Sequence, residues 1–292
     1  PLLTYGTEEQ KKQWLPDLVA GERLAGFGLT EPGAGSDAGA TRTKAVLDGG
    51  EWVLDGSKQF ITNSGSEITS LVTVTARTGT REDGRPEIST IMVPAGTPGF
   101  TAEKAYDKLG WHASDTHPLS FESCRVPAEN LLGQQGRGYA QFLATLDDGR
   151  VAISALSVGC IQACLDMSVA YAGERQTFGG PIGRKQGVAF QIADLEVMLH
   201  ASRMLTYRAA ALKDAGAPYR EFKQAAAVAK LYSTESAVTA TRIATQVFGG
   251  DGFMEEYPVA RFYRDAKVLE IGEGTSEVQR MLIARGLGLP VE

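Results

Sequence analysis

The sequence predicts an α+β protein in which an antiparallel β-barrel or sandwich domain precedes an up-and-down helical bundle. Two observations carry this prediction. From residue 25 to about residue 125, short runs of β-branched and aromatic residues are separated by Gly, Asp, Asn and Pro. After about residue 136, apolar residues recur with the 3.6-residue period of helices. The length of 292 residues is enough for about two domains.

The amino-terminal half should hold one helix and several strands. A short amphipathic helix is predicted over Thr7–Leu24, where an apolar stripe includes Trp14 and Leu18. The strand runs that follow are Thr41–Leu47, Trp52–Leu54, Gln59–Thr62, Leu71–Ala76, Ile88–Val93 and Leu119–Phe121. The Asp-Gly-Gly sequence at 48–50 separates the first two runs and is typical of a hairpin turn. Because no helix lies between these runs, the sheet should be mainly antiparallel.

The carboxy-terminal half should consist of helices. The 3.6-residue period predicts them over Tyr139–Ala172, Val188–Asp214, Tyr219–Phe248 and Thr275–Gly286. Glycine and proline lie between the predicted helices, where turns are expected. Three long helices and a shorter one are typical of an up-and-down bundle.

The composition is that of an ordinary globular protein, with 43% hydrophobic and 22% charged residues. These values exclude a disordered chain, a collagen and a coiled coil. The formal net charge of −6 argues against nucleic-acid binding by bulk charge. The most apolar stretch begins at Val151 and reaches Gln162, which we interpret as too short for a membrane span.

The chain has three cysteines and three histidines, and their spacing predicts neither a disulfide framework nor a metal site. Cys160 and Cys164 are four residues apart on one helix face, where small core residues are a simpler interpretation than a metal pair. The histidines are far apart and none has HxxxH spacing, so a zinc site is not expected. The amino end has no signal-peptide pattern, which together with few cysteines favours a reducing cytoplasm.

Two motifs in the β half have residue types that suit an anion and a flat ring. The Gly-rich turn TEPGAGSD at 30–37 lets the backbone approach an anion, and Ser36 adds a hydroxyl donor. A strand rather than a helix follows this turn, which excludes a P-loop and a dinucleotide-binding fingerprint. In QFITN at 59–63, strand alternation places Phe60 and Thr62 on one face, where they could flank a ring. The simpler alternatives are a surface turn and a core phenylalanine.

Three motifs in the helical half have equally simple structural explanations. DDGR at 147–150 is by default a local ion pair, but Gly149 costs about 1 kcal/mol against Ala inside a helix, which a close ligand would explain. In ERQTFG at 174–179, Arg175 suits bidentate phosphate binding, and a helix end is the alternative. The glycines of QVFGGDGF at 246–253 are explained most simply as a helix end.

The last motif places an acidic residue, Glu273, between two glycines. It precedes a helix that Thr275 or Ser276 would cap. Because the carboxylate has no bulky neighbours in sequence, a flat substrate could reach it. As an alternative role for this segment, Glu277 would complete a capping box or interact with the helix dipole.

Together the motifs resemble those of the acyl-CoA dehydrogenase family of flavoenzymes, in the order TEPGAGSD, QFITN, LDDGR, ERQTFG, QVFGGDGF, YRDAK and EGTSEVQR. The matches extend from about Gly26 to Arg280, and their order makes them far more specific than any one motif. The resemblance implies a β domain over 25–135 and a helical bundle domain over 136–292. Residues 1–24 would be a remnant of an amino-terminal helical domain that the chain otherwise lacks.

The resemblance also implies FAD as cofactor, bound between the β domain and the bundle at a subunit interface of a homodimer or homotetramer. The β-domain residues at FAD would be Phe27, Leu29, Thr30, Gly35, Ser36, Phe60, Ile61 and Thr62, although many members carry Trp in place of Phe60. From the bundle, Arg175, Phe178, Gln186, Gln246, Val247, Phe248, Gly249 and Gly250 would reach the FAD of a neighbouring subunit, and Thr275, Ser276 and Glu277 would close on the cofactor. Acyl-CoA would contact Ser36, Asp147, Asp148, Gly149, Arg150, Gly272 and Gly274.

By the same resemblance, Glu273 is the catalytic base of an α,β-dehydrogenation that yields a trans-2-enoyl-CoA. It would take the Cα proton while the Cβ hydride goes to N5 of FAD, and the electrons would pass to an electron-transfer flavoprotein. Such a base works best when desolvation raises its pKa. One branch of the family places the base near Gly149 instead; since glycine has no side chain, this chain belongs with the late-Glu branch. Gly272 stands where many members have Tyr, which implies a wider pocket.

Two alternatives remain open from the sequence. One is an acyl-CoA oxidase or flavin monooxygenase on the same fold. The other is a non-catalytic subunit of a mixed oligomer. For the dehydrogenase, the expected role is fatty acid β-oxidation, in the cytoplasm of a bacterium or in the mitochondrial matrix of a eukaryote.

Overall fold

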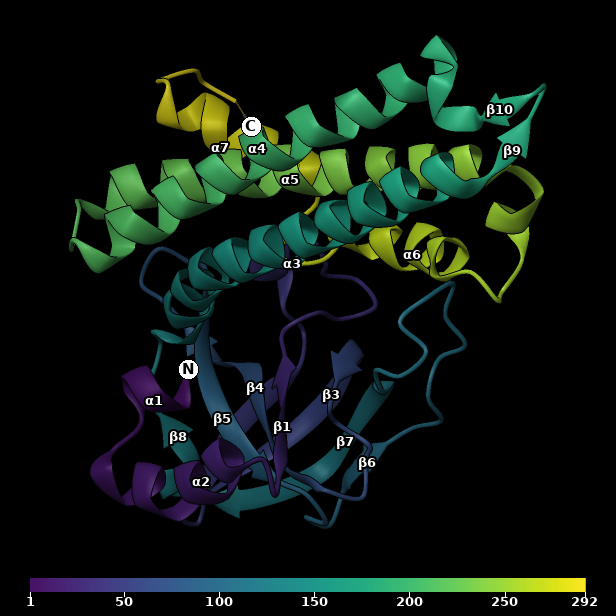
Figure 1. Ribbon diagram of the computed structural model, residues 1–292. Coiled ribbons are helices and arrows are strands. Elements are labelled where there is room, and N and C mark those ends of the chain that lie inside the picture. Colours follow the sequence, from purple (N-terminus) through teal and green to yellow (C-terminus); the bar gives the residue numbers. More distant parts are fainter. Residues whose placement is uncertain (292) are drawn as a thin grey trace. The chain divides into compact units, whose positions relative to one another are not determined.

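In the computed structural model, which describes residues 1–291, the chain divides into two units (Figure 1). Unit 1 contains residues 1–108 and 112–145, and unit 2 contains residues 109–111 and the chain from residue 146 onward. The short segment 109–111 belongs to unit 2 because Asp265 accepts hydrogen bonds from both the main-chain N and the indole Nε1 of Trp111, at 2.6 and 3.0 Å.

Unit 1 is built on one mixed sheet. Its strands are β1 (Leu24–Gly28), β2 (Lys44–Asp48), β3 (Glu51–Thr62), β4 (Thr69–Thr80), β5 (Pro86–Pro94), β6 (Phe100–Ala102), β7 (Thr116–Pro127) and β8 (Leu131–Leu132). They pair in the order β6-β7-β3-β2-β4-β5-β8, and β1 pairs with β4. Five of the pairings are antiparallel, as predicted, but β1 and β2 each run parallel to β4.

The parallel strand β1 was missed because its sequence, LAGFG, contains two glycines and little alternation. The structure shows why glycine is favoured there. A Cβ at Gly26 would lie 3.1 Å from the Val72 side chain, and one at Gly28 would lie 3.2 Å from the Thr73 carbonyl oxygen. The glycines therefore let β1 approach β4 closely.

The other predicted strands are confirmed; most have longer bounds, whereas the run Thr41–Leu47 is shorter in the structure and forms β2 over Lys44–Asp48. The runs Trp52–Leu54 and Gln59–Thr62 are parts of the single strand β3, which the predicted hairpin turn connects to β2. The sheet core consists of alternating residues such as Leu54, Val74 and Ile91, which are completely buried. This core fixes the strand ends from which the candidate ligand-binding residues of unit 1 project.

Two helices precede the sheet, α1 (Leu2–Tyr5) and α2 (Glu8–Ala20). The predicted helix over 7–24 is confirmed in α2, but it ends earlier because Gly21 adopts a left-handed conformation. At its start, Thr7 and Gln10 form a capping box. The Gln10 side chain also donates to the main-chain oxygens of Glu129 and Leu131, at 2.8 and 3.0 Å.

Unit 2 is the helical domain that the sequence predicts. Its helices are α3 (Gly138–Glu174), whose first residues belong to unit 1, α4 (Gln186–Asp214), α5 (Tyr219–Phe248), α6 (Pro258–Ala266) and α7 (Ser276–Gly286). The predicted helices agree with α3, α4, α5 and α7 to within two residues at each end. Short elements complete the fold: β9 (Gln176–Thr177), β10 (Gly180–Pro181), η1 (Ala38–Ala40), η2 (Ala128–Asn130), η3 (Ile182–Arg184), η4 (Gly249–Phe253) and η5 (Lys267–Glu270). Helix α6 was missed because its charged sequence is only nine residues long.

The core of unit 2 lies where α3, α4 and α5 pack together. Ile161, Leu199 and Ile243 belong to one buried cluster that contains residues of all three helices. Cys164 is buried in the same cluster, as the interpretation of a core cysteine predicts. Alanines line much of the buried face of α5, which allows the neighbouring helices to approach it closely.

Helix α3 corrects the expectation that the apolar stretch is too short to span a membrane. By its length and by the apolar character of an 18-residue window, this 37-residue helix could cross one. A third of that window is buried inside the fold. Core helices of soluble proteins can be equally long and apolar, so these properties are weak evidence for a membrane span.

Candidate active site

The turn that carries Glu273 connects η5 to α7 and has an unusual backbone. Glu273 has a positive φ of 55°, and Gly274 follows with a φ of 87°. Such a φ is uncommon outside glycine and is found where the surrounding structure enforces it. Helix α7 then begins at Ser276, and the Thr275 hydroxyl caps it by accepting from the Val278 main-chain N at 3.3 Å. Of the two predicted caps, Thr275 is therefore the one observed.

The Glu273 carboxylate packs against Gly149 of α3. A Cβ placed on Gly149 would lie only 2.5 Å from Oε2 of Glu273 and 3.1 Å from its Cδ. The sequence suggested that a close ligand explains a glycine inside this helix. The close group in the fold is the Glu273 carboxylate itself.

The surroundings of Glu273 raise its pKa, as expected of a base. Burial is the main cause, because it disfavours the charged carboxylate. The positive charges of Arg150 and Lys230 act in the opposite direction but do not cancel the effect of burial. The raised pKa makes the Glu273 carboxylate a stronger proton acceptor than an exposed glutamate.

The predicted acyl-CoA residues at 147–150 have different environments. Asp147 and Arg150 are buried and form an ion pair with each other, and Asp147 also accepts from the Tyr219 hydroxyl. The local ion pair is thus confirmed for these two residues. Asp148 is exposed and pairs with Lys213. Arg150 Nε is buried and has no hydrogen-bond partner within the described part of the chain.

Two buried polar side chains at the Glu273 turn were missed by sequence reasoning, Lys230 of α5 and Gln279 of α7. Lys230 Nζ donates to the Gly274 carbonyl oxygen at 2.8 Å. Gln279 Nε2 donates to the same oxygen at 2.9 Å and to the Glu273 carbonyl oxygen at 3.3 Å. A signal for Lys230 was present, since it stands in the helical register of core residues on α5.

In unit 1, a buried ion pair fixes the base of the Gly-rich turn. Glu31 accepts from Lys58 Nζ at 2.7 Å and from the main-chain N atoms of Arg42 and Thr43. Burial would raise the pKa of Glu31, but the Lys58 charge and these hydrogen bonds lower it overall. Burial likewise lowers the pKa of Lys58 to about 8, against the opposing effect of Glu31. This pair was not predicted from the sequence.

Beyond the ion pair, the turn and the end of β3 present accessible groups. Gly35 and Ser36 are exposed, and a Cβ on Gly35 would meet nothing within 4 Å. Phe60 is 58% exposed with a φ of 60°, and Thr62 is exposed as well. Both lie outside the core, as predicted, whereas Ile61 between them is buried; regular alternation is not the reason, because β3 has a register shift between Lys58 and Ile61.

The other unit 1 residues predicted at FAD have limited side-chain access. Phe27 stacks on Phe142, with ring centroids 4.0 Å apart. Leu29 is buried, and Thr30 is half-buried. Phe27 already packs against protein, and Leu29 and Ile61 offer a ligand mainly their main chain.

The predicted FAD residues at the end of α5 lie away from the Glu273 turn. Gln246 follows Lys230 by sixteen residues on α5, which corresponds to about 24 Å along a helix. Among the predicted FAD residues of unit 2 that precede this turn, the exposed ones are Arg175, Phe178, Gln186, Gln246, Gly249 and Gly250. Phe178 is 95% exposed with a φ of 51°. Val247 and Phe248 are buried, and Phe248 stacks on Tyr171 at 4.1 Å.

The accessible groups of unit 1 fit the chemistry of FAD. An exposed aromatic ring, threonine and serine hydroxyls and an open glycine suit a flat ring system and a pyrophosphate. In unit 2, Ser276 Oγ is buried and has no hydrogen-bond partner within residues 1–291. By contrast, those residues contain no group of three His, Cys, Asp or Glu side chains that could hold a metal ion.

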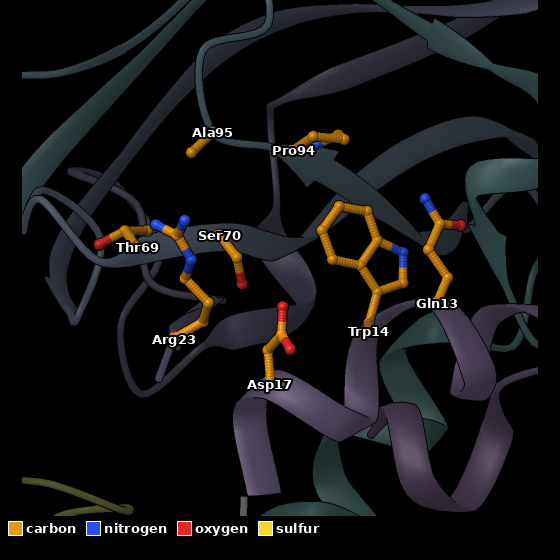
Figure 2. Close-up of a pocket in the computed structure, with 8 residues that line it drawn as sticks. All are labelled: Gln13, Trp14, Asp17, Arg23, Thr69, Ser70, Pro94 and Ala95. Carbon is orange, nitrogen blue, oxygen red and sulfur yellow. The ribbon is translucent and has the colours of Figure 1, made fainter. Parts of the chain in front are cut away.

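A shallow pocket in unit 1, of about 340 Å³, contains none of the predicted site residues. Figure 2 shows its lining: Gln13, Trp14, Asp17, Arg23, Thr69, Ser70, Pro94 and Ala95. Asp17 and Arg23 are exposed, so the pocket has no buried charged group to orient a ligand.

Two family models match the chain, and together they cover both units. Residues 26–124 match the acyl-CoA dehydrogenase middle domain, and residues 136–288 match the acyl-CoA dehydrogenase C-terminal domain. The chain belongs to the acyl-CoA dehydrogenase family.

Curated relatives of this family agree with the models. A probable acyl-CoA dehydrogenase of Bacillus subtilis is 50% identical over 98% of this chain and 74% of its own length. The rat mitochondrial short-chain specific acyl-CoA dehydrogenase is 44% identical, over 97% of this chain and 68% of its own length. An acryloyl-CoA reductase (NADH) of Anaerotignum propionicum is 45% identical, over 96% of this chain and 70% of its own length.

Solved structures of the family have the same fold. Butyryl-CoA dehydrogenase from Megasphaera elsdenii matches with a TM-score of 0.93 and 42% identity, over 98% of this chain and 74% of its own. A structure described as an electron transferring flavoprotein of Acidaminococcus fermentans, in work on flavin-based electron bifurcation, matches with a TM-score of 0.92 and 42% identity over the same shares. Members of the acyl-CoA dehydrogenase family depend on FAD.

Proposed function

We propose that this protein catalyses the FAD-dependent α,β-dehydrogenation of a short-chain acyl-CoA, with Glu273 as the general base. The observation that carries the proposal is the half-buried Glu273 carboxylate, packed against Gly149 and with a raised pKa. The short-chain preference rests on the names of two relatives, the short-chain specific enzyme and butyryl-CoA dehydrogenase.

The chain's own residues account for the removal of the Cα proton in this reaction. The saturated thioester loses a proton from Cα to Glu273 and a hydride from Cβ, and a carbon–carbon double bond forms between these atoms. Burial favours the protonated form of Glu273, which lowers the cost of accepting that proton. Main-chain N–H groups beside the thioester would polarise its carbonyl and make the Cα proton more acidic.

FAD, when bound, supplies the acceptor for the Cβ hydride. Phe60, Thr62, Gly35 and Ser36 of unit 1 would hold it, since these groups are exposed and suit a flat ring and a pyrophosphate. We further propose an electron-transfer flavoprotein as the physiological electron acceptor, which the similarity to the Acidaminococcus fermentans structure supports. The cellular role would be fatty acid β-oxidation, in a reducing compartment where the cysteines stay free.

The test is anaerobic reduction of the FAD-loaded holoenzyme by a panel of saturated acyl-CoA thioesters. Flavin bleaching should be fastest with chains of about four carbons, and an artificial electron acceptor should sustain turnover. Absence of bleaching with every thioester would contradict the proposal and favour a non-catalytic subunit. Rapid reoxidation of the reduced flavin by oxygen would favour an acyl-CoA oxidase instead.

We also propose that the protein is a homo-oligomer that associates through α4. One face of this helix packs in the unit 2 core through residues such as Leu195 and Leu199. The opposite face carries an exposed apolar stripe at seven- and three-residue spacing: Phe190, Val197, Met204 and Tyr207, each 63–68% exposed. An exposed stripe of this kind is typical of a protein interface.

We expect a second copy of the chain to cover the stripe. The exposed group around Arg175 and Gln246 lies far along the helices from Glu273, so it is suited to the FAD of another subunit rather than of its own. Within one copy, that group and the base are separate. The residues near Arg175 would then complete the FAD site of the neighbouring subunit.

Introducing a charge into the stripe should dissociate the oligomer. In Met204→Glu, burying a carboxylate in the interface is unfavourable, whereas a solvent-exposed position on an isolated subunit tolerates it. Light scattering should show a species of smaller mass, and circular dichroism should show unchanged helicity. Glu221→Lys, at an exposed position on α5 and so away from the α4 stripe, is the control, which should keep the parent's mass. A parent protein that is a monomer with full FAD content would contradict this prediction.

A further inference from the structure

A buried lysine that the proposed reaction does not use makes a hydrogen bond to the Glu273 turn. Lys230 is completely buried on α5. Lysine is rarely buried without a specific partner, because removing its charge from water is costly. Its observed partner is the carbonyl oxygen of Gly274, the residue that follows Glu273.

The hydrogen bonds at this turn explain how its strained backbone is kept. Glu273 and Gly274 both have positive φ, which places the two carbonyl groups toward buried donors. Lys230 supplies a charged donor, and Gln279 supplies an amide that reaches both carbonyl oxygens. Both donors are completely buried, so water cannot replace them without opening the packing. The direction of the Glu273 side chain follows from this backbone conformation.

The charges around Lys230 show that it also acts on the carboxylate. Burial is the main cause that lowers the pKa of Lys230 to about 8, and Arg150 of α3 lowers it further. Glu273, Glu270 and Glu235 act in the opposite direction. At neutral pH the amine is therefore mostly protonated, and its charge is one of the two that lower the pKa of Glu273, the other being Arg150.

We propose that Lys230 is a positioning residue for the general base: its buried ammonium, anchored on the Gly274 carbonyl, fixes the turn that aims the Glu273 carboxylate. The role of Lys230 in catalysis rests on the proposed function of Glu273. Its effect on the geometry and ionisation of Glu273 does not, and can be measured without substrate.

Two variants separate the hydrogen bond from the charge. Lys230→Met removes both while keeping an unbranched side chain, and Lys230→Gln removes the charge but keeps a donor. In Lys230→Met, the rate of flavin reduction at its high-pH plateau should fall about 100-fold, the usual cost of a misplaced catalytic group. In Lys230→Gln, part of this rate should return. In both variants, the midpoint of the pH profile should move upward by about one pH unit, because a positive charge near the carboxylate is lost.

A substrate-free measurement keeps the proposal independent of the reaction. The pKa of Glu273 is obtained from the pH dependence of the difference in unfolding free energy between a protein and its Glu273→Gln counterpart. The Lys230→Met background should give a higher pKa than the parent background. Lys223→Met, which removes a cation above the Tyr219 ring of the same helix, is the control and should leave the pKa unchanged.

The outcomes distinguish the two proposals. If no acyl-CoA reduces the flavin but the pKa of Glu273 still depends on Lys230, the proposed function fails and the positioning of Glu273 stands. If Lys230→Gln folds, binds FAD and keeps the parent's rate, pH midpoint and Glu273 pKa, the positioning role is wrong. A loss of FAD content or stability with no change in midpoint or Glu273 pKa would show a purely structural role and would equally overturn it.

Discussion

Replacing Glu273 by glutamine should lower the rate of flavin reduction by acyl-CoA by about 10²- to 10⁴-fold, the usual contribution of a positioned general base. The amide keeps the shape of the side chain but cannot accept the Cα proton. Within the described residues, positions 149 and 270 offer no substitute. Gly149 has no side chain, and Glu270 pairs with Lys267 in η5. Anaerobic single-turnover bleaching of the flavin measures this rate directly.

The fold and FAD binding should survive this change. Because burial raises the pKa of Glu273 above its ordinary value of 4.5, ionising the carboxyl in the folded state is unfavourable. Relative to the glutamine variant, the parent therefore loses stability as the pH rises from 4.5 through the raised pKa. At neutral pH, Glu273→Gln should be at least as stable as the parent, which thermal unfolding across this pH range would show.

Two further results are expected for Glu273. The parent's reduction rate should increase with pH through the raised pKa, since only the ionised carboxylate accepts a proton. Glu273→Asp should retain part of the activity, because its carboxylate is present but one methylene further away. If Glu273→Gln reduced the flavin at nearly the parent's rate, the base would have to lie elsewhere.

Replacing Gly149 by alanine should change stability and activity in opposite directions. Alanine in the interior of α3 is favoured over glycine by about 1 kcal/mol. The new Cβ, however, would be 2.5 Å from Oε2 of Glu273, so the carboxylate must move. Because that atom is the end of a flexible side chain, the fold can adapt, but the base is displaced. A displacement of about 1 Å is enough to lower the rate of flavin reduction about 100-fold.

Gly159 provides the matched control for this prediction. It lies on the same helix, and a Cβ there would meet nothing within 4 Å. Gly159→Ala should therefore gain a similar stability without losing activity. Thermal unfolding compares the stabilities of the two variants, and single-turnover flavin reduction compares their activities. Equal activity of Gly149→Ala and Gly159→Ala would mean that the carboxylate acts from a different position in the working enzyme.

The periodicity of the sequence was sufficient to predict the long helices, and the predicted range of α5 agrees with the structure at both ends. It was insufficient for β1, whose two glycines are present for close contact with β4 rather than for a strand pattern. Contacts between distant segments explain these failures. Local propensity contains no information about which strand a glycine must approach.

The same limit applies to the candidate site. Motif order was enough to single out Glu273, but the positive φ of Glu273 and Gly274 was not predicted. The sequence did not reveal that Lys230 and Gln279 reach the Gly274 carbonyl from two different helices, because such pairings depend on the tertiary fold. The pairing of Lys58 with Glu31 was missed for the same reason. Buried polar partners of this kind are specified by packing and not by spacing.

The contact between Gly149 and Glu273 has a consequence for how such a site can change in evolution. The two residues share one small volume, since a Cβ at position 149 would lie 2.5 Å from Oε2 of Glu273. An acidic side chain could enter it from the helix backbone at 149 or from the turn at 273, but not from both at once. Substitutions at these two positions should therefore be coupled across related proteins, with a large side chain at one position accompanied by a small one at the other. Related proteins would then keep the position of the carboxylate, while the residue that carries it could change from one segment to the other.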